Sequence, residues 1–461
     1  MKVILLSGGS GKRLWPLSND ARAKQFLKVL KTEDSQLESM VQRVWRQLSS
    51  VGLAKESFIV TGKAQVDMLQ NQLGYDVPII IEPERRDTFP AISLSSVYLS
   101  DVVGLSEEEV VTVLPVDSYV DDKFFEKVKE LEKIVNQSDA QLALIGIKPT
   151  YPSTKYGYIV PHEEGGNYFR VKSFVEKPSE HEAAKLIEHN ALWNAGIFAF
   201  RLGFLLDLLK TKGYPTEYET FVKKYCMLTK ISFDYEVVEK TENIVALSYN
   251  GEWKDLGTWN TLTEEIDDFV LGKGIISDDC ENTHLVNELE IPVMVLGLSN
   301  VVVAASPDGI LVADKAASPR LKDVVGNFKH RPMYEERRWG WYRVLDYTKL
   351  DNGKEVLTKR VRLLAGRNLS YQIHYKRSEV WTIISGEGEF ILNGELRKVQ
   401  EGDVLQIPVE ARHAMKAITD LEFIEIQRGA ELIEEDIVRL AMTWDDILSH
   451  VEYIGTNRNV K

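Results

Sequence analysis

A glycine-rich segment follows the first apolar run of the chain and is a candidate for chemistry. Gly8 and Gly9 come directly after residues 3–7, and Arg13 follows shortly. Glycines in this position let backbone N–H groups approach a phosphate without a Cβ clash, and an arginine adds a charge-assisted donor. The spacing is neither GxGxxG nor the Walker pattern. The segment therefore predicts either a phosphate-binding loop or a tight turn, because glycine serves both.

A second candidate lies near the carboxyl end of the chain. Gln372 and His374 stand two residues apart in a strand-like segment, so their side chains share one face of the strand. Glu379 and His413 follow. A lone histidine in a strand is more often packed or exposed than a ligand, so spacing by itself leaves both interpretations open.

The elements that would position the first candidate have an α/β pattern over residues 1–270. Short apolar runs alternate with helical patterns at residues 37–48 and 124–135. This alternation predicts βαβ units and a mainly parallel sheet. The apolar runs are residues 3–6, 58–60, 78–81, 110–114 and 142–147.

The remainder of the chain has a β-rich pattern. Short runs within residues 275–325 predict a small β module or a β-solenoid, and the polar stretch at 328–338 indicates a linker. Several short runs with Gly-containing turns at 339–430 predict an antiparallel barrel or jelly roll. Residues 431–448 show helical spacing and predict a helix.

Composition excludes several classes of protein. The 461 residues suggest about two to four domains. With 56 Lys and Arg against 70 Asp and Glu, the net charge of −14 argues against a general nucleic-acid binder. Two cysteines exclude a disulfide framework, and no apolar run approaches a membrane span of about 18 residues. We expect a cytoplasmic protein with no membrane partner.

A series of motifs in fixed order makes the first candidate specific. The motifs are GGSGKRLWPLS at 8–18, KQFL at 24–27, EP at 82–83, RRDTFPA at 85–91, LPVD at 114–117, GIKPT at 146–150, YGYI at 156–159, FVEKP at 174–178, WNAGIF at 193–198 and WKDLGTW at 253–259. By these motifs the chain resembles, over residues 1–325, the sugar-1-phosphate nucleotidylyltransferases, and among them the bacterial mannose-1-phosphate guanylyltransferases.

The resemblance implies a reaction between two anions. An oxygen of a sugar-1-phosphate attacks the α-phosphorus of GTP and pyrophosphate leaves, so the protein must align both reactants and neutralise charge. In the family, residues matching Gly8, Gly9 and Arg13 cradle the triphosphate, and Lys24 lies near the α-phosphate. An isolated lysine is usually only solvated, so the role of Lys24 depends on the motif order.

The resemblance also implies a magnesium site. Asp117 and Asp255 match the two carboxylates that hold Mg²⁺, whose hard character suits oxygen ligands. Each aspartate has a simpler alternative, since Asp117 could cap a helix and Asp255 could begin a turn.

A sugar pocket is implied by four further residues. Glu176 matches the acceptor for sugar hydroxyls and Lys177 the partner of the sugar phosphate, while Asn194 and the Gly157 backbone complete the pocket. The chain departs from the family pattern at positions that include Lys12, Ala23, Asp87 and Ser118. These changes concern base and sugar recognition, so another GDP-hexose or GDP-heptose is an alternative product to GDP-mannose.

The carboxyl-terminal candidate resembles the cupin motifs and, with RWGWY at 338–342, the type II mannose-6-phosphate isomerase domain. The resemblance implies a divalent metal such as zinc held by Gln372, His374, Glu379 and His413, with open positions for substrate. Arg377 would then face a phosphate or an enediolate. Tyr375 and Lys376 stand where the family has histidines, so a non-catalytic cupin is the alternative.

We therefore expect an α/β protein: a Rossmann-like mixed-sheet nucleotidyltransferase domain at 1–270, a small β-rich module and linker at 271–330, and a jelly-roll cupin with a carboxyl-terminal helix at 331–461. The expected partners are GTP and a sugar-1-phosphate, with Mg²⁺ as cofactor and a homo-oligomer as one option. A regulator that binds sugar nucleotides without turnover is a further alternative. The predicted metal carboxylates argue against it, because binding alone would not need them.

Overall fold

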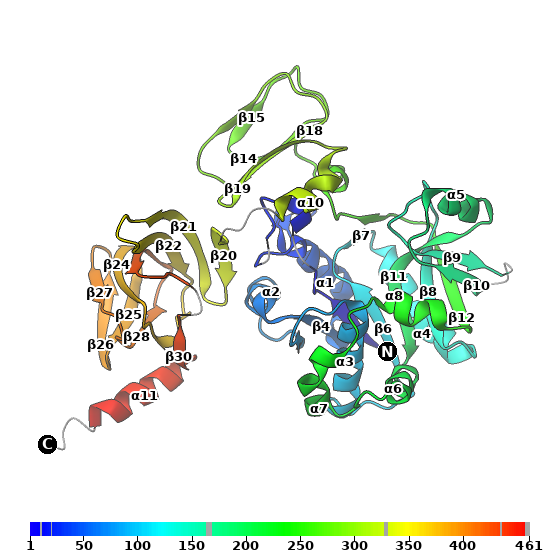
Figure 1. Cartoon of the computed structure of the whole chain (residues 1–461), viewed down its shortest axis with the longest axis horizontal. Coiled ribbons are helices and arrows are strands. Elements are labelled where there is room, and N and C mark those ends of the chain that lie inside the picture. The colour runs from blue at the N-terminus through cyan, green and yellow to red at the C-terminus, as the bar shows by residue number, and fades with distance from the viewer. Residues whose placement is uncertain (10–11, 20, 163–167, 327–330, 434–435, 457–461) are drawn as a thin grey trace.

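The computed structural model describes residues 1–9, 12–19, 21–162, 168–326, 331–433 and 436–456 (Figure 1). Ser10 and Gly11 of the predicted phosphate loop lie outside the described residues. The chain folds into three parts that follow one another in sequence: an α/β domain, a small β module and a β sandwich (Figure 1).

A nine-stranded sheet forms the centre of the α/β domain, in the order β5-β4-β1-β6-β11-β8-β12-β10-β9. The first four strands pair in parallel, as do β8 and β12, whereas β11, β10 and β9 pair antiparallel. The expectation of a mainly parallel sheet is therefore wrong in its second half, because hydrophobic periodicity does not report strand direction. The strands are β1 (Lys2–Leu6), β4 (Ser57–Gly62), β5 (Ile79–Glu82), β6 (Val110–Pro115), β8 (Leu142–Ile147), β9 (Tyr158–Pro161), β10 (Phe169–Val175), β11 (Leu192–Arg201) and β12 (Ile244–Tyr249).

Helices cover both faces of this sheet. On β1, Val3 and Leu5 pack into one apolar cluster and Ile4 into the other, because successive side chains point to opposite faces. Burial on both faces explains why the strands are continuously apolar. The helices are α1 (Met40–Ser50), α2 (Val66–Leu73), α3 (Thr88–Asp101), α4 (Lys123–Gln137), α5 (Glu180–Glu188), α6 (Leu202–Thr211), α7 (Tyr218–Lys223), α8 (Phe233–Glu236) and α9 (Trp259–Leu262).

The predicted helix at 37–48 begins later than its apolar spacing suggests. Ser39 caps α1 by accepting a hydrogen bond from the backbone N–H of Gln42, and the Gln42 side chain reciprocates. The preceding residues form β3 (Leu37–Glu38), which pairs with β2 (Leu30–Lys31).

The small β module stacks short strands in parallel. β14 (Val270–Gly272), β16 (His284–Asn287) and β18 (Val301–Ser306) form one parallel set, and β15 (Gly274–Ile276) with β17 (Val293–Val295) forms another. This stacking favours the solenoid alternative. β19 (Gly309–Asp314) closes the larger sheet, and α10 (Leu321–Val325) follows.

Two antiparallel sheets form the carboxyl-terminal sandwich, with a buried apolar cluster that includes Trp381 and Phe423. The sandwich confirms the expected β-rich domain. Its strands are β20 (Tyr334–Arg337), β21 (Gly340–Lys349), β22 (Glu355–Leu363), β23 (Tyr371–Ile373), β24 (Arg377–Ser385), β25 (Glu387–Leu392), β26 (Glu395–Gln400), β27 (Val404–Ile407), β28 (His413–Ala417), β29 (Leu421–Gly429) and β30 (Val438–Ala441).

Two expectations about the ends of the sandwich are wrong. The stretch predicted as a linker contains β20, which pairs with β21, although residues 327–330 lie outside the described residues. The tail predicted as a helix from 431 instead forms β30 against β23, and α11 (Trp444–Thr456) begins only afterwards. In both cases an open sheet edge offers backbone hydrogen bonds that local periodicity does not reveal.

In the part of the chain that the structure describes, no helix has both the length and the apolar character needed to cross a membrane.

Candidate functional site

A cavity of about 390 Å³ opens at the end of the first sheet where the carboxyl ends of β1 and β6 lie. It gathers most of the predicted nucleotide and sugar residues. Its lining includes Gly9, Lys12, Arg13, Lys24, Asp117, Lys155, Gly157, Glu176, Asn194, Asp234, Asp255 and Lys322.

The start of the chain forms one wall of this cavity. Gly8 and Gly9 leave β1 at its carboxyl end, and Arg13 lies exposed in a single helical turn at Lys12–Leu14. A Cβ on Gly8 would lie 3.0 Å from the buried Glu82 carboxylate, a tight contact that glycine avoids. Gly9 and Arg13 line the cavity, whereas Gly8 does not. This arrangement can present N–H groups and a guanidinium to an anion.

Lys24 is held in place by its neighbour Gln25. The Gln25 side-chain amide donates to the backbone oxygen of Ser7 at 2.9 Å, which ties the turn at Lys24–Phe26 to the end of β1. The Lys24 ammonium can therefore point into the cavity instead of into solvent, as an isolated surface lysine would.

Asp117 and Asp255 meet because two short strands pair. Asp117 lies between β6 and β7 (Ser118–Val120), and Asp255 ends β13 (Trp253–Asp255), which runs antiparallel to β7. Asp117 therefore does not cap a helix, and Asp255 belongs to a strand. The Lys24 ammonium lies 2.8 Å from Asp117 Oδ2 and 3.3 Å from Asp255 Oδ1.

The contacts of Lys24 show that this pair of carboxylates accommodates a cation. Burial disfavours the charged form of Lys24, but the two carboxylates outweigh burial and raise its pKa. The ammonium stands where a divalent cation would bind the same oxygens, and these hard donors suit Mg²⁺. The residues present thus fit the metal that the resemblance implies.

The opposite end of the cavity contains the predicted sugar residues. A Cβ on Gly157 would lie 2.5 Å from Glu176 Oε2, so only glycine permits this close approach. Asn194 donates to Asp234 Oδ1 at 2.8 Å and accepts from the Gly196 N–H at 3.1 Å. Burial raises the pKa of Glu176, and burial together with the charge of Glu176 raises the pKa of Asp234 to about 7.

Lys177 is the predicted catalytic residue of this domain that does not line the cavity. Its ammonium pairs with Glu176 and lies 5.7 Å from the centre of the Tyr235 ring. Its backbone has a φ of 48°, a strained conformation for a residue with a side chain. The structure therefore brings Lys177 next to the sugar residues without placing it among them.

Sequence reasoning assigned no site role to four further residues that line the cavity. Lys12, Lys155 and Lys322 add positive charge, and Asp234 adds a half-buried carboxyl. Lys12 was visible only as a departure from the family pattern. Lys322 comes from α10 of the β module, and no local motif could have placed it in the cavity of another domain.

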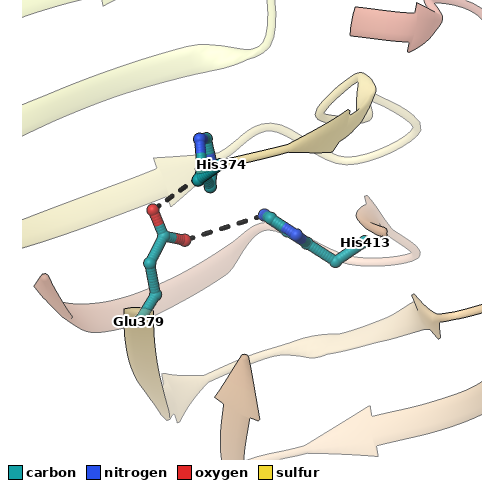
Figure 2. A group of neighbouring side chains, drawn as sticks. All are labelled: His374, Glu379 and His413. Atoms are coloured by element: carbon teal, nitrogen blue, oxygen red, sulfur yellow. Dashed lines mark ion pairs between the residues drawn. The ribbon is translucent and has the colours of Figure 1, made fainter. Parts of the chain in front are cut away.

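A second cluster lies inside the sandwich, where His374, Glu379 and His413 converge (Figure 2). Their ligand atoms lie within 4.8 Å of one another, and all three side chains are buried. The Glu379 carboxylate lies 3.3 Å from His374 Nε2 and 3.7 Å from His413 Nε2. This is the nitrogen and oxygen donor set that zinc and related divalent ions take.

The backbone selects the histidine tautomers that can bind a metal. His374 Nδ1 lies 2.6 Å from the Asp436 carbonyl oxygen, and His413 Nδ1 lies 3.1 Å from that of Ala411. Each Nδ1–H therefore donates to a carbonyl and leaves Nε2 as the acceptor. Burial lowers the pKa of His374 to about 4, helped by Arg377, and lowers that of His413 to about 3, helped by His374. Both rings are neutral near pH 7, as ligands must be.

Gln372 and Arg377 complete this cluster. The Gln372 amide nitrogen lies 3.3 Å from His374 Nε2 and 3.4 Å from His413 Nε2, so Gln372 faces the cluster. Its Oε1, the atom that would bind a metal, accepts a hydrogen bond from the Ser370 hydroxyl at 2.9 Å instead. The buried Arg377 donates to Glu379 Oε1 at 2.9 Å and to the Ile433 carbonyl oxygen at 3.0 Å. All five residues predicted for the second site therefore come together, in agreement with a metal pocket.

Comparison with known proteins follows the same division of the chain. Residues 2–270 match the family described as nucleotidyl transferase, and residues 326–442 match mannose-6-phosphate isomerase C-terminal. The xanthan biosynthesis protein XanB of Xanthomonas campestris pv. campestris (strain B100) is 32% identical, over 96% of this chain and 98% of that protein. The mannose-1-phosphate guanylyltransferase of Salmonella montevideo is 30% identical, over 95% of this chain and 98% of that protein.

A solved structure also resembles the chain. The crystal structure of mannose-1-phosphate geranyltransferase from Thermus thermophilus has a TM-score of 0.59 and 28% identity, and the match covers 70% of this chain and 98% of that one. Full-length relatives, the fold and the two clusters lead to one conclusion. This chain belongs to the nucleotidyl transferase family and carries behind that domain a mannose-6-phosphate isomerase C-terminal domain.

Proposed function

We propose that the first domain transfers GMP from GTP to mannose-1-phosphate, giving GDP-mannose and pyrophosphate. The observation that carries this proposal is the Lys24 ammonium between Asp117 and Asp255, in a cavity lined by the glycine-rich start of the chain. Relatives named mannose-1-phosphate guanylyltransferase support the choice of nucleotide and sugar.

The reaction depends on alignment of the two substrates by the protein more than on covalent catalysis. A phosphate oxygen of the sugar-1-phosphate forms a bond to the α-phosphorus while the bond from that phosphorus to the bridging oxygen breaks, and pyrophosphate carries away the electron pair. The attacking phosphate is already ionised near pH 7, so no general base is required. Gly9, Arg13 and Lys24 would hold the triphosphate, and Glu176 would accept hydrogen bonds from sugar hydroxyls.

Asp117 and Asp255 would hold Mg²⁺, which supplies charge neutralisation at the reacting phosphates when it is bound. Lys24 then shifts from the two carboxylates to the α-phosphate, where its charge opposes the negative charge that develops. The Lys24 side chain is only 15% exposed before this movement, so little additional surface of the side chain has to be buried. Lys177 reaches the sugar phosphate only after leaving Glu176.

The activity of the full chain tests this proposal. GTP with mannose-1-phosphate should release pyrophosphate faster than other pairs in a matrix of nucleoside triphosphates and sugar-1-phosphates. Preference for another hexose or a heptose would support the alternative product. Absence of turnover with every pair would support the non-catalytic regulator instead.

One substitution tests the metal role directly. Asp255→Asn should lower the rate of pyrophosphate release by about 100-fold or more, because a neutral amide binds Mg²⁺ much more weakly than a carboxylate and forms no ion pair with Lys24. Asp278→Asn, at an exposed position of the β module, is the matched control and should retain the wild-type rate. Equal rates in both variants would remove Asp255 from the metal site.

We also propose that the sandwich interconverts mannose-6-phosphate and fructose-6-phosphate. The two neutral histidines aimed at Glu379 favour a metal pocket over a purely structural cupin. Gln372, His374, Glu379 and His413 would hold a divalent ion such as Zn²⁺, which polarises the sugar carbonyl when bound. Arg377 would then stabilise the negative oxygen of the enediolate.

Metal content and isomerisation test this second function together. His374→Ala should lose both the bound metal, measured by elemental analysis, and the isomerase activity, while it retains guanylyl transfer. His181→Ala, on the exposed side of α5, is the control and should retain all three properties. A wild-type protein that binds metal but does not isomerise would support the non-catalytic cupin.

A further inference from the structure

A second cavity, of about 620 Å³, lies where the sandwich meets the α/β domain. From the sandwich it is lined by Gln372 and Arg377 of the second cluster. From the α/β domain it is lined by the segment that includes Lys63 and Asp67, at the start of α2. The pocket of the carboxyl-terminal domain therefore has one wall that the sandwich does not supply. Figure 1 shows β20 and α2 at this boundary.

Side-chain contacts hold this wall against the sandwich. Asn71 of α2 donates from its side chain to the backbone oxygen of Arg337 on β20. The Tyr75 hydroxyl donates to the Arg338 carbonyl at 2.9 Å, and the Arg367 guanidinium lies 4.3 Å from the centre of the Tyr75 ring. The end of β20 and the turn that follows it are thereby fixed to α2, which brings Lys63 to the cavity.

The lining of the cavity carries an excess of positive charge. Its cationic residues outnumber its carboxylates, which are Asp67 and Glu425. Burial raises the pKa of Glu425 to about 7, helped by the charge of Glu379, so its carboxylate is only partly ionised at neutral pH. The cations are Lys63, Arg337, Arg338, Lys359, Arg377 and Arg439.

These cations belong to two regions of the cavity. Arg377 contacts the predicted metal ligands, whereas Arg338 lies in the turn between β20 and β21 and donates to the Met442 carbonyl oxygen at 3.0 Å. Burial lowers the pKa of Arg338, and Arg439 and Arg367 add repulsion. A cluster of like charges at the domain boundary is stabilised by an anion, so this region suits the phosphate of a ligand whose other end reaches the metal ligands.

We propose that Lys63 of the α/β domain is a binding residue of the carboxyl-terminal pocket, where its ammonium binds the phosphate of a phosphorylated sugar. The proposal rests on the second proposed function and deepens it. The pocket is composite, because the sandwich provides the metal ligands and Arg377 while the α/β domain provides part of the phosphate site. Docking of the two domains is thus a requirement for tight binding of the sugar phosphate.

Isothermal titration calorimetry of the full chain with mannose-6-phosphate tests the proposal. Lys63→Ala should weaken binding about tenfold, as expected for loss of one charge-assisted contact. Lys63→Arg should restore most of the affinity. Lys55→Ala, at an exposed lysine of the same domain outside both cavities, is the matched control and should bind like the wild type.

A second variant tests the docking itself. Replacing Asn71 by Ala and Tyr75 by Phe removes the two hydrogen bonds to the sandwich but retains Lys63. This double variant should also weaken mannose-6-phosphate binding. When it is combined with Lys63→Ala, the total loss of affinity should be smaller than the sum of the two separate losses, because both changes act on the same wall of the cavity.

The outcomes separate the two hypotheses. If the wild type binds mannose-6-phosphate and Lys63→Ala binds equally well, the composite pocket is wrong and the isomerase function stands. If Lys63→Arg does not recover affinity, Lys63 has a structural role and the phosphate contact is wrong. If the wild type does not bind mannose-6-phosphate, the isomerase function fails and the composite pocket fails with it.

Discussion

At the scale of single residues, each candidate metal site pairs its carboxylates with a cation of the protein. Lys24 bridges Asp117 and Asp255, and Arg377 binds Glu379. Such a cation holds the carboxylates in a fixed orientation before a metal or substrate arrives. The difference lies in burial, because Arg377 is 4% exposed and further anchored by a backbone carbonyl, whereas Lys24 is 15% exposed and lines an open cavity.

The raised pKa of Asp234 predicts that the stability of the protein depends on pH. Its pKa of about 7 lies above its ordinary value, chiefly because of burial. Its stabilising contribution is therefore present below about pH 4 and is lost as the pH rises through 7. Asp234→Asn should retain the hydrogen bond from Asn194 and avoid this loss, so its melting temperature should exceed that of the wild type by about 2–4 °C at pH 8.

Thermal unfolding at two pH values provides the check. The advantage of Asp234→Asn should be smaller at pH 5 than at pH 8, and it should disappear only below about pH 4, where the carboxyl is protonated in both the folded and the unfolded protein. Asp278→Asn, at an exposed site, should show the same melting temperature as the wild type at both values. An advantage that does not depend on pH would show that Asp234 titrates like an exposed aspartate.

At the scale of elements, tight turns of the sandwich depend on glycines for two separable reasons. Gly386 has a φ of 87°, and a Cβ there would lie 2.1 Å from the Asp420 backbone oxygen. Gly402 has a φ of 88° but no atom within 4 Å of such a Cβ. One position therefore requires both the left-handed conformation and the space, and the other requires only the conformation.

Replacing each glycine by alanine should separate these two costs. Gly402→Ala should lower the free energy of unfolding by about 1 kcal/mol, the usual cost of a left-handed alanine. Gly386→Ala should lower it by about 3 kcal/mol or more, because backbone must also move. Urea unfolding followed by tryptophan fluorescence measures both, since Trp381 is buried in the core of the sandwich. Equal costs would show that the Asp420 backbone moves away from position 386 without strain.

At the scale of the whole molecule, the chain keeps two kinds of donor set in separate domains. The first cavity offers carboxylate oxygens, while the sandwich offers two imidazoles, a carboxylate and an amide. Oxygen donors suit Mg²⁺, and nitrogen donors suit zinc and related ions. A cytoplasmic location and a homo-oligomer stay predictions.

Removal of metal should therefore affect the two reactions differently. After dialysis against a chelator, Mg²⁺ alone should restore pyrophosphate release from GTP and mannose-1-phosphate but not isomerisation, which should return only with Zn²⁺ or a similar ion. Both assays on the same sample make the comparison. Recovery of both activities by Mg²⁺ alone would contradict the assignment of separate metals.

The sequence by itself determined the family, the order of the domains and most of the strands. Long apolar runs such as β8 need no tertiary information, because residues buried on both faces leave a continuous signal. The residues predicted to bind metal at the two sites also come from motif order, and their metal role stays a prediction. In the sandwich, the Gln-x-His spacing already places Gln372 and His374 on one face of a strand.

Only the tertiary structure decided where distant elements meet. Pairing of β7 with β13 brings Asp255 to Asp117, α10 brings Lys322 into the first cavity, and docking of α2 brings Lys63 to the second. The same holds for β20 and β30, which join sheet edges against their local pattern. Local sequence encodes periodicity and turn chemistry, whereas these contacts join residues far apart in the chain and depend on which surfaces the folded domains leave open.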